Sequence, residues 1–384
     1  MDPAYRKLLE KQGYKFIGEH SACKTCHYTA SSIAGKGTCY KQKFYGIQSH
    51  RCVQMTVAAN FCNLDCVFCW RKRNNSPFGK VDDPVELVDR AVAAQLKSLS
   101  GFGGNPHADR QKFVESKQPL HFAISLNGEN TAYPKLGEFI AELTRRGYTS
   151  FLVTNGQLPE VLAKIPPPTQ LYISVSAPNE ELFNAVDKPM YKDGWQRLLK
   201  SLDLLRQFRE EGRTRTVIRL TLIKGITMKP EHVEQFAEMI RRGNPMFLEC
   251  KSYMFVGTSK ERLERDNMAS HIDIREFAAA VGEKCGYNVV DEQEESRVVL
   301  MMQENTADSS VDRFLSIEGL NPTHSVNWVE DGTSSFESSG KLAVATIAAM
   351  DDSQSHEEAA EPLFELKMPQ LRVHTVGDES AKHL

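Results

Sequence analysis

The segment Phe61-Cys62-Asn63-Leu64-Asp65-Cys66-Val67-Phe68-Cys69-Trp70 carries three cysteines in the pattern C-x3-C-x2-C. Clusters of four irons are normally held by four cysteine thiolates. Three thiolates on one short loop can hold three of those irons, so that the fourth iron stays open for a small molecule. The triplet therefore predicts an open [4Fe–4S] site at Cys62, Cys66 and Cys69.

A structural zinc site is the alternative interpretation of the triplet. Zinc takes four ligands, usually as two pairs of cysteines or histidines, whereas the nearest histidine is His50, upstream of all three cysteines. A disulfide is not expected, because the chain opens with Met1–Lys7 rather than with a secretory signal. The ligand chemistry therefore favours an iron–sulfur cluster.

The composition is that of an ordinary globular protein. The chain has 384 residues, of which 25% are charged and 41% hydrophobic, and this length allows one large domain or two smaller ones. No apolar run reaches the roughly 20 residues that span a bilayer. We therefore expect a cytoplasmic monomer with no membrane partner, in which clustered cysteines bind metal or act in catalysis.

The net charge of −3 is unevenly distributed. Residues from Asp331 onward carry −6, which leaves +3 on the first 330 residues. Basic clusters lie at Arg71-Lys72-Arg73, at Arg206, Arg209, Arg213 and Arg215, and at Lys260, Arg262 and Arg265. Such clusters attract phosphates, although a solvated surface of mixed charge is the simpler interpretation.

Strand-like and helix-like segments alternate along the chain. The predicted strands are Arg51–Ala58, Leu120–Leu126, Ser150–Thr154, Leu171–Val175, Thr216–Leu222 and Met246–Phe255. The predicted helices are Pro84–Leu99, Lys135–Arg146, Glu180–Val186, Trp195–Arg209, Pro230–Arg241 and Ile274–Cys285. This α/β alternation predicts a parallel sheet closed into a full or partial β/α barrel, with its active site at the C-terminal strand ends. A doubly wound sheet is the alternative, but it needs a glycine-rich turn where this chain has its cysteine triplet.

A second set of cysteines precedes the triplet. Cys26, Cys39 and Cys52 are thirteen residues apart, and Cys23 forms a C-x2-C pair with Cys26. From the residues alone, these four thiols fit either a zinc site or a second iron–sulfur cluster. Lys41 and Lys43 follow Cys39, and a lysine of this kind is usually a phosphate contact or a solvated charge.

Together these motifs resemble the tRNA 4-demethylwyosine synthases, a family of radical S-adenosylmethionine enzymes, in the archaeal form without a fused flavodoxin domain. The resemblance is carried by Cys26…Cys39-Tyr40-Lys41…Cys52, by the triplet with Trp70-Arg71, and by Ser125–Glu129, Val153–Gly156, Tyr172–Ala177, Arg219–Gly225, Lys251–Met254 and Glu295–Leu300. It implies a radical-SAM partial (β/α)6 barrel over residues 51–305. An N-terminal cysteine-rich extension would occupy residues 1–50, and C-terminal additions of no assigned role would occupy residues 306–384.

The resemblance also implies a reaction. A radical S-adenosylmethionine lyase of this family builds the tricyclic base of 4-demethylwyosine from N1-methylguanosine, beside the anticodon of phenylalanine tRNA, with carbons from pyruvate. Two [4Fe–4S] clusters are implied. The triplet would hold the cluster that splits S-adenosylmethionine to a 5′-deoxyadenosyl radical, and Cys26, Cys39 and Cys52 would hold an auxiliary cluster whose open iron binds pyruvate. The electron donor would be external, such as a flavodoxin or ferredoxin.

Lys41 matches the lysine that is proposed to form a Schiff base with pyruvate. An amine attacks a ketone only when neutral, and burial or a nearby positive charge lowers a lysine's pKa toward that state. Lys43 is the competing candidate. For Cys23 the alternatives are a spare thiol, a fourth ligand or neither, and a fourth thiolate would close the open iron.

Five further residues match contacts to S-adenosylmethionine: Phe68, Gly128, Glu129, Asn155 and Ser176. Gly128-Glu129 resembles a G-G-E element that meets the methionine ammonium, although Asn127 replaces its first glycine. Asn155 and Ser176 are assigned to the ribose or carboxylate, and Phe68 to stacking near adenine. Arg71, Lys72, Arg73 and Met254–Arg262 are candidate RNA contacts.

Two other functions compete with this interpretation. One is a different radical enzyme with an auxiliary cluster, acting on RNA or on a peptide. The other is a zinc-stabilised RNA-binding protein without catalysis. The metal that the protein holds after anaerobic purification separates the two radical enzymes from the zinc protein.

Overall fold

The computed structural model describes residues 1–72, 75–303, 313–318, 320, 322, 326–328 and 334–336. Arg73 of the first basic cluster and most of the expected C-terminal additions lie outside these residues. The described strands form a ten-stranded sheet in the order β1-β2-β3-β4-β5-β6-β7-β8-β10-β9, and a separate antiparallel pair, β11 (Val326–Trp328) and β12 (Ser334–Phe336). Among the described helices, none combines the length and the apolar character that crossing a bilayer requires.

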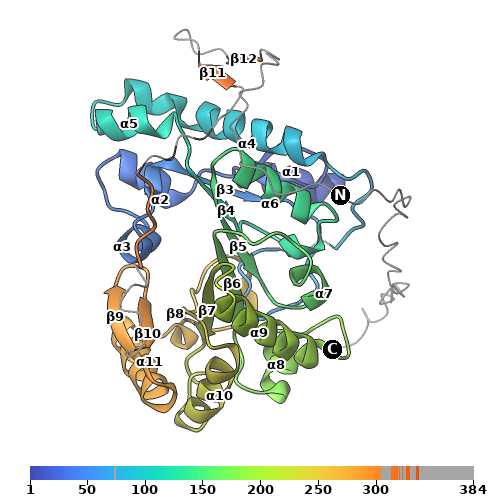
Figure 1. Cartoon of the computed structure of the whole chain (residues 1–384), viewed down its shortest axis with the longest axis vertical. Helices are drawn as coiled ribbons and strands as arrows, with labels where there is room; N and C mark the ends of the chain where they lie inside the picture. Colours follow the sequence, from blue (N-terminus) through green and yellow to red (C-terminus); the bar gives the residue numbers. More distant parts are fainter. Residues whose placement is uncertain are drawn as a thin grey trace, which may run out of the picture. The chain divides into compact units, whose positions relative to one another are not determined.

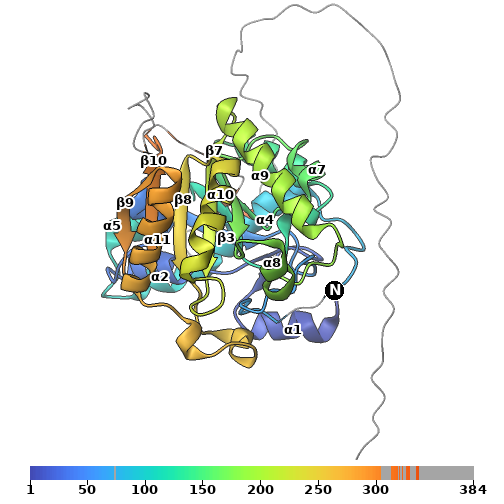
Figure 2. The same cartoon turned by 90° about the horizontal axis from the view of Figure 1, so that it is seen from below.

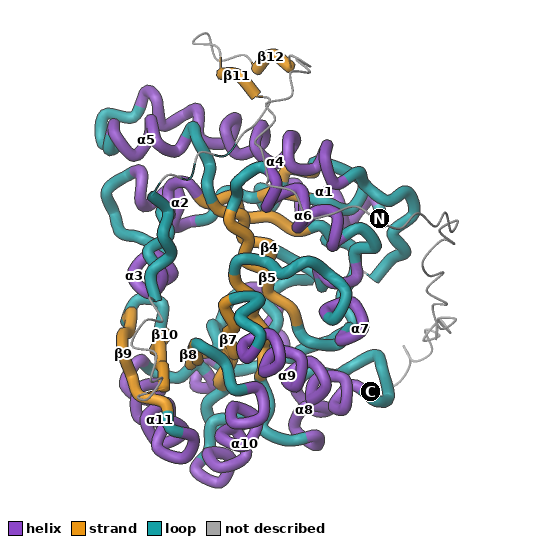
Figure 3. The backbone as a smooth tube through the Cα atoms, in the orientation of Figure 1, coloured by secondary structure: helices purple, strands orange, loops and turns teal. Residues whose placement is uncertain are grey.

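Six neighbouring strands of the large sheet are parallel and follow chain order, which confirms the predicted α/β architecture. They are β3 (Cys52–Thr56), β4 (His121–Ile124), β5 (Thr149–Thr154), β6 (Gln170–Val175), β7 (Arg215–Leu222) and β8 (Phe247–Ser252). Their connections contain α4 (Pro84–Leu99), α6 (Leu136–Arg145), α7 (Pro159–Leu162), α8 (Glu180–Val186), α9 (Gly194–Glu210) and α10 (Val233–Gly243), and α11 (His271–Cys285) follows β8. Figures 1 and 3 show the strands as a curved row with these helices along its outer side.

Local sequence explains why α4 forms where the pattern predicts it. Asp83 caps the helix by accepting hydrogen bonds from the Val85 and Glu86 amides at 3.0 and 3.1 Å, and Pro84 occupies the first turn. Leu87, Val88, Ala91 and Val92 then form a buried stripe with helical spacing. This stripe joins the main hydrophobic core, which also contains Phe122 and Ile124 of β4.

The sheet extends beyond the predicted strands on both edges. On one edge, β1 (Lys15–Phe16) and β2 (Ala22–Cys23) join β3 as antiparallel strands. On the other, β10 (Val298–Gln303) joins β8 and pairs with β9 (Tyr287–Gln293). The short helices α1 (Pro3–Lys11), α2 (His27–Ile33), α3 (Tyr40–Tyr45) and α5 (Arg110–Ser116) were also not predicted. Except for α1, β9 and β10, these elements are short, so they show too few turns or alternations for a periodic pattern. In β10, Val298–Met302 are apolar at successive positions, so this strand lacks the alternation of a half-buried strand.

The helices α2 and α3 lie across the open side of the barrel, between β3 and the β9–β10 hairpin (Figure 1). The Tyr28 and Ser296 hydroxyls are 2.7 Å apart, and the Gln293 amide donates to the Thr38 carbonyl at 3.2 Å. Apolar side chains of α3 pack inside the barrel against Phe151 of β5, Tyr172 of β6 and Phe247 of β8. The N-terminal segment therefore fills the interior that six strands leave open.

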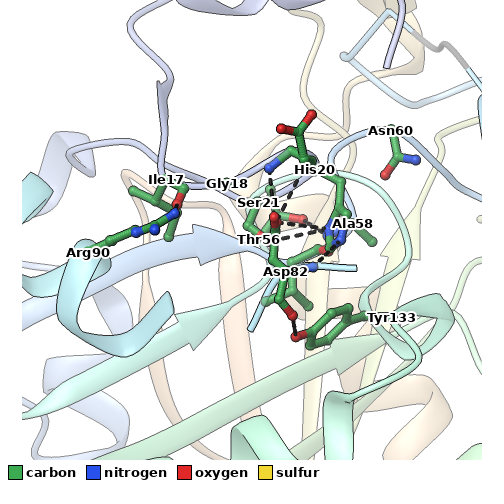
Figure 4. A network of polar contacts seen from close by, with 12 residues as sticks. Ile17, Gly18, His20, Ser21, Thr56, Ala58, Asn60, Asp82, Arg90 and Tyr133 are labelled. Carbon is green, nitrogen blue, oxygen red and sulfur yellow. Dashed lines mark hydrogen bonds and ion pairs between the residues drawn. The ribbon is translucent and has the colours of Figure 1, made fainter. Parts of the chain in front are cut away.

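A buried polar network secures both ends of the cysteine loop, which we define as residues 57–82. The Asp82 carboxylate accepts hydrogen bonds from the Glu19 and His20 amides at 2.7 and 3.3 Å. Its backbone amide donates to His20 Nε2 at 3.2 Å, and its carbonyl accepts from the Tyr133 hydroxyl at 2.6 Å. Figure 4 shows His20 beside Asp82, with Tyr133 pointing at Asp82. The Asn60 amide donates to the Ser76 carbonyl at 2.8 Å and so closes the loop near its start.

We predict that Asp82→Ala lowers the free energy of unfolding by about 2–4 kcal/mol, because it leaves two amide donors without their acceptor in a buried place. Urea unfolding of the anaerobically purified protein measures this loss. Asp203→Ala is the control, because it removes only an exposed ion pair with Arg242 and should cost about 1 kcal/mol or less. Equal losses in the two variants would contradict the proposed importance of the Asp82 network.

Candidate active site

A cavity opens at the C-terminal ends of the parallel strands, where barrel enzymes place their catalytic groups. Cys62, Cys66 and Cys69 line one part of its wall. The five predicted S-adenosylmethionine contacts line the same cavity: Phe68, Gly128, Glu129, Asn155 and Ser176. The structure thus brings together residues that lie up to 114 positions apart in the sequence, from Cys62 to Ser176.

Hydrogen bonds to its backbone hold the cysteine loop from two sides. The Asp65 and Val67 amides each donate at 2.8 Å, to the Asp187 and Val186 carbonyls at the end of α8. On the other side, Arg262 donates to the Val67 carbonyl at 3.0 Å and Thr258 donates to the Cys69 carbonyl at 3.3 Å. Figure 2 shows the gold segment that includes η5 (Gly257–Glu261) and the helix α1 at the bottom of the view. Both segments contact this loop.

Gly128 has a structural reason to be glycine. Its φ is +66°, and a Cβ atom there would lie 1.8 Å from the Ala58 carbonyl oxygen. The next residue, Glu129, is buried, and its carboxylate accepts hydrogen bonds from the Thr154 hydroxyl at 2.7 Å and the Asn155 amide at 2.9 Å. Burial raises the pKa of Glu129, while these donors act in the opposite direction. Glu129 therefore fixes the end of β5 as well as lining the cavity.

Asn155 and Ser176 also have partners within the site. The side-chain Nδ2 of Asn155 donates to Asn63 Oδ1 at 2.7 Å and lies 3.9 Å from Cys62 Sγ. The Ser176 hydroxyl donates to the Asp187 carboxylate at 2.6 Å. Phe68 packs in a small apolar cluster with Val186 and other residues. These contacts orient the predicted ligand-binding side chains around the triplet.

The second cysteine set comes together at a different place. Cys26 and Cys39 immediately precede α2 and α3, and Cys52 begins β3. Burial and the neighbouring Cys26 thiol raise the pKa of Cys39 to about 12, and the pKa of Cys52 is raised by burial and by both other thiols. These mutual effects show that the three thiols lie near one another. Three neighbouring thiols are a donor set that fits an iron–sulfur cluster.

A single zinc ion finds no matching ligand group in the described part of the chain. No three His, Cys, Asp or Glu side chains there gather around one point as the ligands of one metal ion do. A four-iron cluster does not need such a point, because each cysteine binds a different iron.

Cys23 is buried in the hydrophobic core beside β3, and burial alone raises its pKa.

Lys41 and Lys43 have different environments. Lys41 is only 9% exposed, and its ammonium lies 4.3 Å from the ring centroid of Tyr172 inside the barrel. Burial lowers the pKa of Lys41, and Glu249 and Cys39 partly oppose this shift. Lys43 points outward, and its side chain is 51% exposed and pairs with Asp291 at 2.9 Å. Lys41 therefore has the environment expected of a reactive amine, and Lys43 that of a surface ion pair.

Glu249 is a site residue that the sequence patterns missed. It is fully buried in β8, and its two oxygens accept hydrogen bonds from the Tyr40 and Tyr45 hydroxyls at 3.1 and 2.8 Å. These tyrosines flank Lys41 on α3, so Glu249 holds the helix that carries the lysine. An acidic residue two positions after Phe247 in an apolar strand was the available signal, because side chains two apart share one strand face.

Arg219 of β7 connects the two cysteine sets. It lines the cavity that contains Cys62, Cys66 and Cys69. It also acts on the groups around α3: burial lowers its pKa, but Tyr40 and Glu249 raise it to a larger extent. Arg219 therefore lies at the cavity and also interacts with Tyr40 and Glu249, the residues that surround Lys41.

Two protein-family profiles match the chain. The profile described as the radical SAM superfamily matches residues 56–240, and the one described as wyosine base formation matches residues 242–303. A Pyrococcus horikoshii protein named S-adenosyl-L-methionine-dependent tRNA 4-demethylwyosine synthase is 46% identical over 308 residues, covering 78% of this chain and 88% of that protein. The Methanocaldococcus jannaschii protein of the same name is 36% identical over 310 residues, covering 78% and 96%.

Two solved structures have the same fold. One is described as TYW1 with a lysine–pyruvate adduct bound. It is 35% identical with a TM-score of 0.71, and the match covers 79% of this chain and 97% of that one. A crystal structure of archaeal TYW1 is 32% identical with a TM-score of 0.68, covering 82% and 100%.

We predict that Glu249→Ala lowers the free energy of unfolding by about 2–4 kcal/mol, because it leaves two buried tyrosine hydroxyls without an acceptor. Urea unfolding of the metal-loaded protein measures this. Glu234→Ala removes an exposed pair with Arg241 and is the matched control, with an expected cost of about 1 kcal/mol or less. A Glu249→Ala protein as stable as this control would contradict the role given to Glu249.

Proposed function

This chain belongs to the family of S-adenosyl-L-methionine-dependent tRNA 4-demethylwyosine synthases, and from that membership we propose that it builds the 4-demethylwyosine base in tRNA. The substrates are N1-methylguanosine beside the anticodon of phenylalanine tRNA, and pyruvate. One observation supports the proposal above all. A buried lysine, Lys41, lies close to Cys39 and Cys52 of one three-cysteine set, in the same barrel whose cavity is lined by the other three-cysteine set.

The radical SAM family implies S-adenosylmethionine and one [4Fe–4S] cluster. We assign that cluster to Cys62, Cys66 and Cys69, and a second one to Cys26, Cys39 and Cys52. When bound, the first cluster and S-adenosylmethionine supply one-electron chemistry to the cavity. Cys26, Cys39 and Cys52 lie close enough to one another to raise the pKa values of Cys39 and Cys52, and this proximity supports the second assignment.

The chain's own groups prepare Lys41 to react with pyruvate. Burial disfavours the charged ammonium, so a larger fraction of the amine is neutral than in water. The neutral Nζ attacks the keto carbon of pyruvate, a carbon–nitrogen bond forms, and water leaves to give the Schiff base. The Tyr172 and Phe151 rings beside the ammonium limit the access of bulk water to this step.

The cavity residues have a separate role in the proposal. Asn155 and Ser176 hold polar atoms of S-adenosylmethionine, Phe68 contacts the adenine, and Gly128 with Glu129 meets the methionine ammonium. Thr154 and Asn155 donate hydrogen bonds to Glu129, and Ser176 donates to Asp187, so these side chains are positioned before the ligand arrives. Such preorganisation lowers the entropic cost of binding.

Several partner assignments complete the proposal. The anticodon loop of phenylalanine tRNA is the macromolecular substrate. A flavodoxin or ferredoxin supplies electrons from outside the chain, and the enzyme works as a cytoplasmic monomer.

The experiment that tests the proposal is an anaerobic reaction with reductant, S-adenosylmethionine, pyruvate and phenylalanine tRNA that carries N1-methylguanosine. We expect mass spectrometry of the digested tRNA to show the tricyclic nucleoside. Lys41→Ala should still cleave S-adenosylmethionine but lose the product, because the amine that activates pyruvate is gone. Lys43→Ala is the matched control and should keep most of the product, because it removes a surface ion pair with Asp291 and a hydrogen bond to the Glu292 carbonyl, both on the outside of the barrel.

Two results would contradict the proposal at different points. An intact wild-type enzyme that forms no tricyclic nucleoside would overturn the substrate assignment. A Lys41→Ala enzyme with wild-type product yield would overturn the Schiff-base role and leave the substrate assignment in place.

A further inference from the structure

Arg71 has an unfilled hydrogen-bonding position at the cavity. Its Nη1 atom is buried and has no hydrogen-bond partner in the described part of the structure. Nor does any described carboxylate form an ion pair with its guanidinium. Buried arginines normally pair with an anion, because burying a charge without a partner is costly. The missing anion is therefore expected to come from a ligand.

The Arg71 side chain is held in place by aromatic rings. Its guanidinium carbon lies 3.8 Å from the ring centroid of Trp70 and 5.4 Å from that of Tyr14. Stacking of this kind uses the faces of the planar guanidinium and leaves its N–H groups, which lie in the plane, available to an anion. The charge is thus positioned without being neutralised.

The backbone around Arg71 is fixed on both sides. The Thr258 amide donates to the Trp70 carbonyl at 3.1 Å, and a Cβ at Gly257 would lie 2.1 Å from that carbonyl oxygen. On the other side, the Tyr5 hydroxyl donates to the Lys72 carbonyl at 2.8 Å. The helix α1 and the segment containing η5 therefore hold the Trp70–Lys72 backbone between them.

The surroundings of Arg71 indicate the kind of anion. Trp70 is 44% exposed although it is large and apolar, and Lys72 beside Arg71 is exposed as well. An exposed aromatic ring next to cationic side chains is the arrangement with which proteins bind single-stranded nucleic acid, with bases on the ring and phosphates on the charges. Arg71 and Lys72 line the same cavity as the cysteine triplet, so a strand held there reaches the reactive site.

We propose that Arg71 binds a phosphate of the tRNA strand beside the modified guanosine, and that a neighbouring base stacks on the exposed face of Trp70. This inference rests on the proposed function, because it takes the RNA as the occupant. The carboxylate of S-adenosylmethionine is the other anion that enters this cavity. We favour the phosphate because Trp70 and Lys72 are exposed, whereas the five residues assigned to S-adenosylmethionine are buried or half-buried.

The test measures binding of a phenylalanine-tRNA anticodon stem-loop at several salt concentrations, together with the KM for S-adenosylmethionine in reductive cleavage without RNA. Loss of one phosphate contact should weaken RNA binding by Arg71→Ala about tenfold. It should also reduce the magnitude of the salt slope, which is the slope of the logarithm of the binding constant against the logarithm of the salt concentration, by about 0.7–1. Arg71→Lys keeps the charge and should preserve the slope. The KM for S-adenosylmethionine should not change in either variant.

Arg242→Ala is the matched control for charge. Arg242 lies in the last turn of α10 and pairs with Asp203, away from the C-terminal strand ends, so its loss should change neither affinity nor slope. Arg71→Gln keeps most of the side-chain volume and replaces Arg71→Ala in the comparison if the alanine variant loses its iron.

The possible results distinguish the phosphate site, a contact to the carboxylate of S-adenosylmethionine, and the proposed function. The proposal would be overturned if Arg71→Ala and Arg71→Gln both bound RNA with the same affinity and the same salt slope as the control, Arg242→Ala. A raised KM for S-adenosylmethionine with an unchanged RNA slope would also overturn it and assign Arg71 to the carboxylate. A wild-type enzyme that shows the Arg71-dependent slope but makes no tricyclic nucleoside would leave the phosphate site standing and overturn the proposed function alone.

Discussion

Six parallel strands do not close a barrel by themselves, and much of the site depends on how the open side is filled. In this protein α3 fills it, packing Tyr40, Phe44 and Tyr45 against inward-facing side chains of β5–β8 and β10. This packing has a chemical consequence, because Lys41 lies between Tyr40 and Phe44 on the same short helix. The apolar contacts that complete the core therefore also carry a lysine into the barrel and place Cys39 near Cys26 and Cys52.

A barrel interior that contains Lys41, Arg219, Glu249 and Lys251 must balance these charges. Glu249 accepts two tyrosine hydrogen bonds and raises the pKa values of the basic groups around it. For Lys251 burial dominates, and its pKa falls to about 8. Burial therefore favours the neutral form of both lysines, Lys41 and Lys251, beside one buried carboxylate. A neutral amine at Lys41 is what the proposed reaction with pyruvate requires.

The parts of the fold that repeat could be predicted from the sequence. The six parallel strands and the longer helices between them follow the hydrophobic patterns of strands and helices, and the range Pro84–Leu99 was predicted to the residue. The short helices α5 and α7 between the strands were not predicted. The five cavity residues were found through a motif or their place after a strand. Glu249 and Arg219 were not assigned a role, because a single charged residue in an apolar strand shows only which face it lies on. The partners on α3, from a segment about 200 positions away, appear only once the chain is folded.

The central claim is that the chain holds two separate clusters, one in each three-cysteine set. Iron and sulfide analysis of the anaerobically purified protein tests it most directly, with Cys26, Cys39 and Cys52 replaced by alanine in one variant and Cys62, Cys66 and Cys69 in another. Two four-iron cubes predict about eight irons per chain in the wild type and about four in each variant. Colourless protein with one or two zinc ions, or a variant without Cys26, Cys39 and Cys52 that keeps all eight irons, would contradict the account.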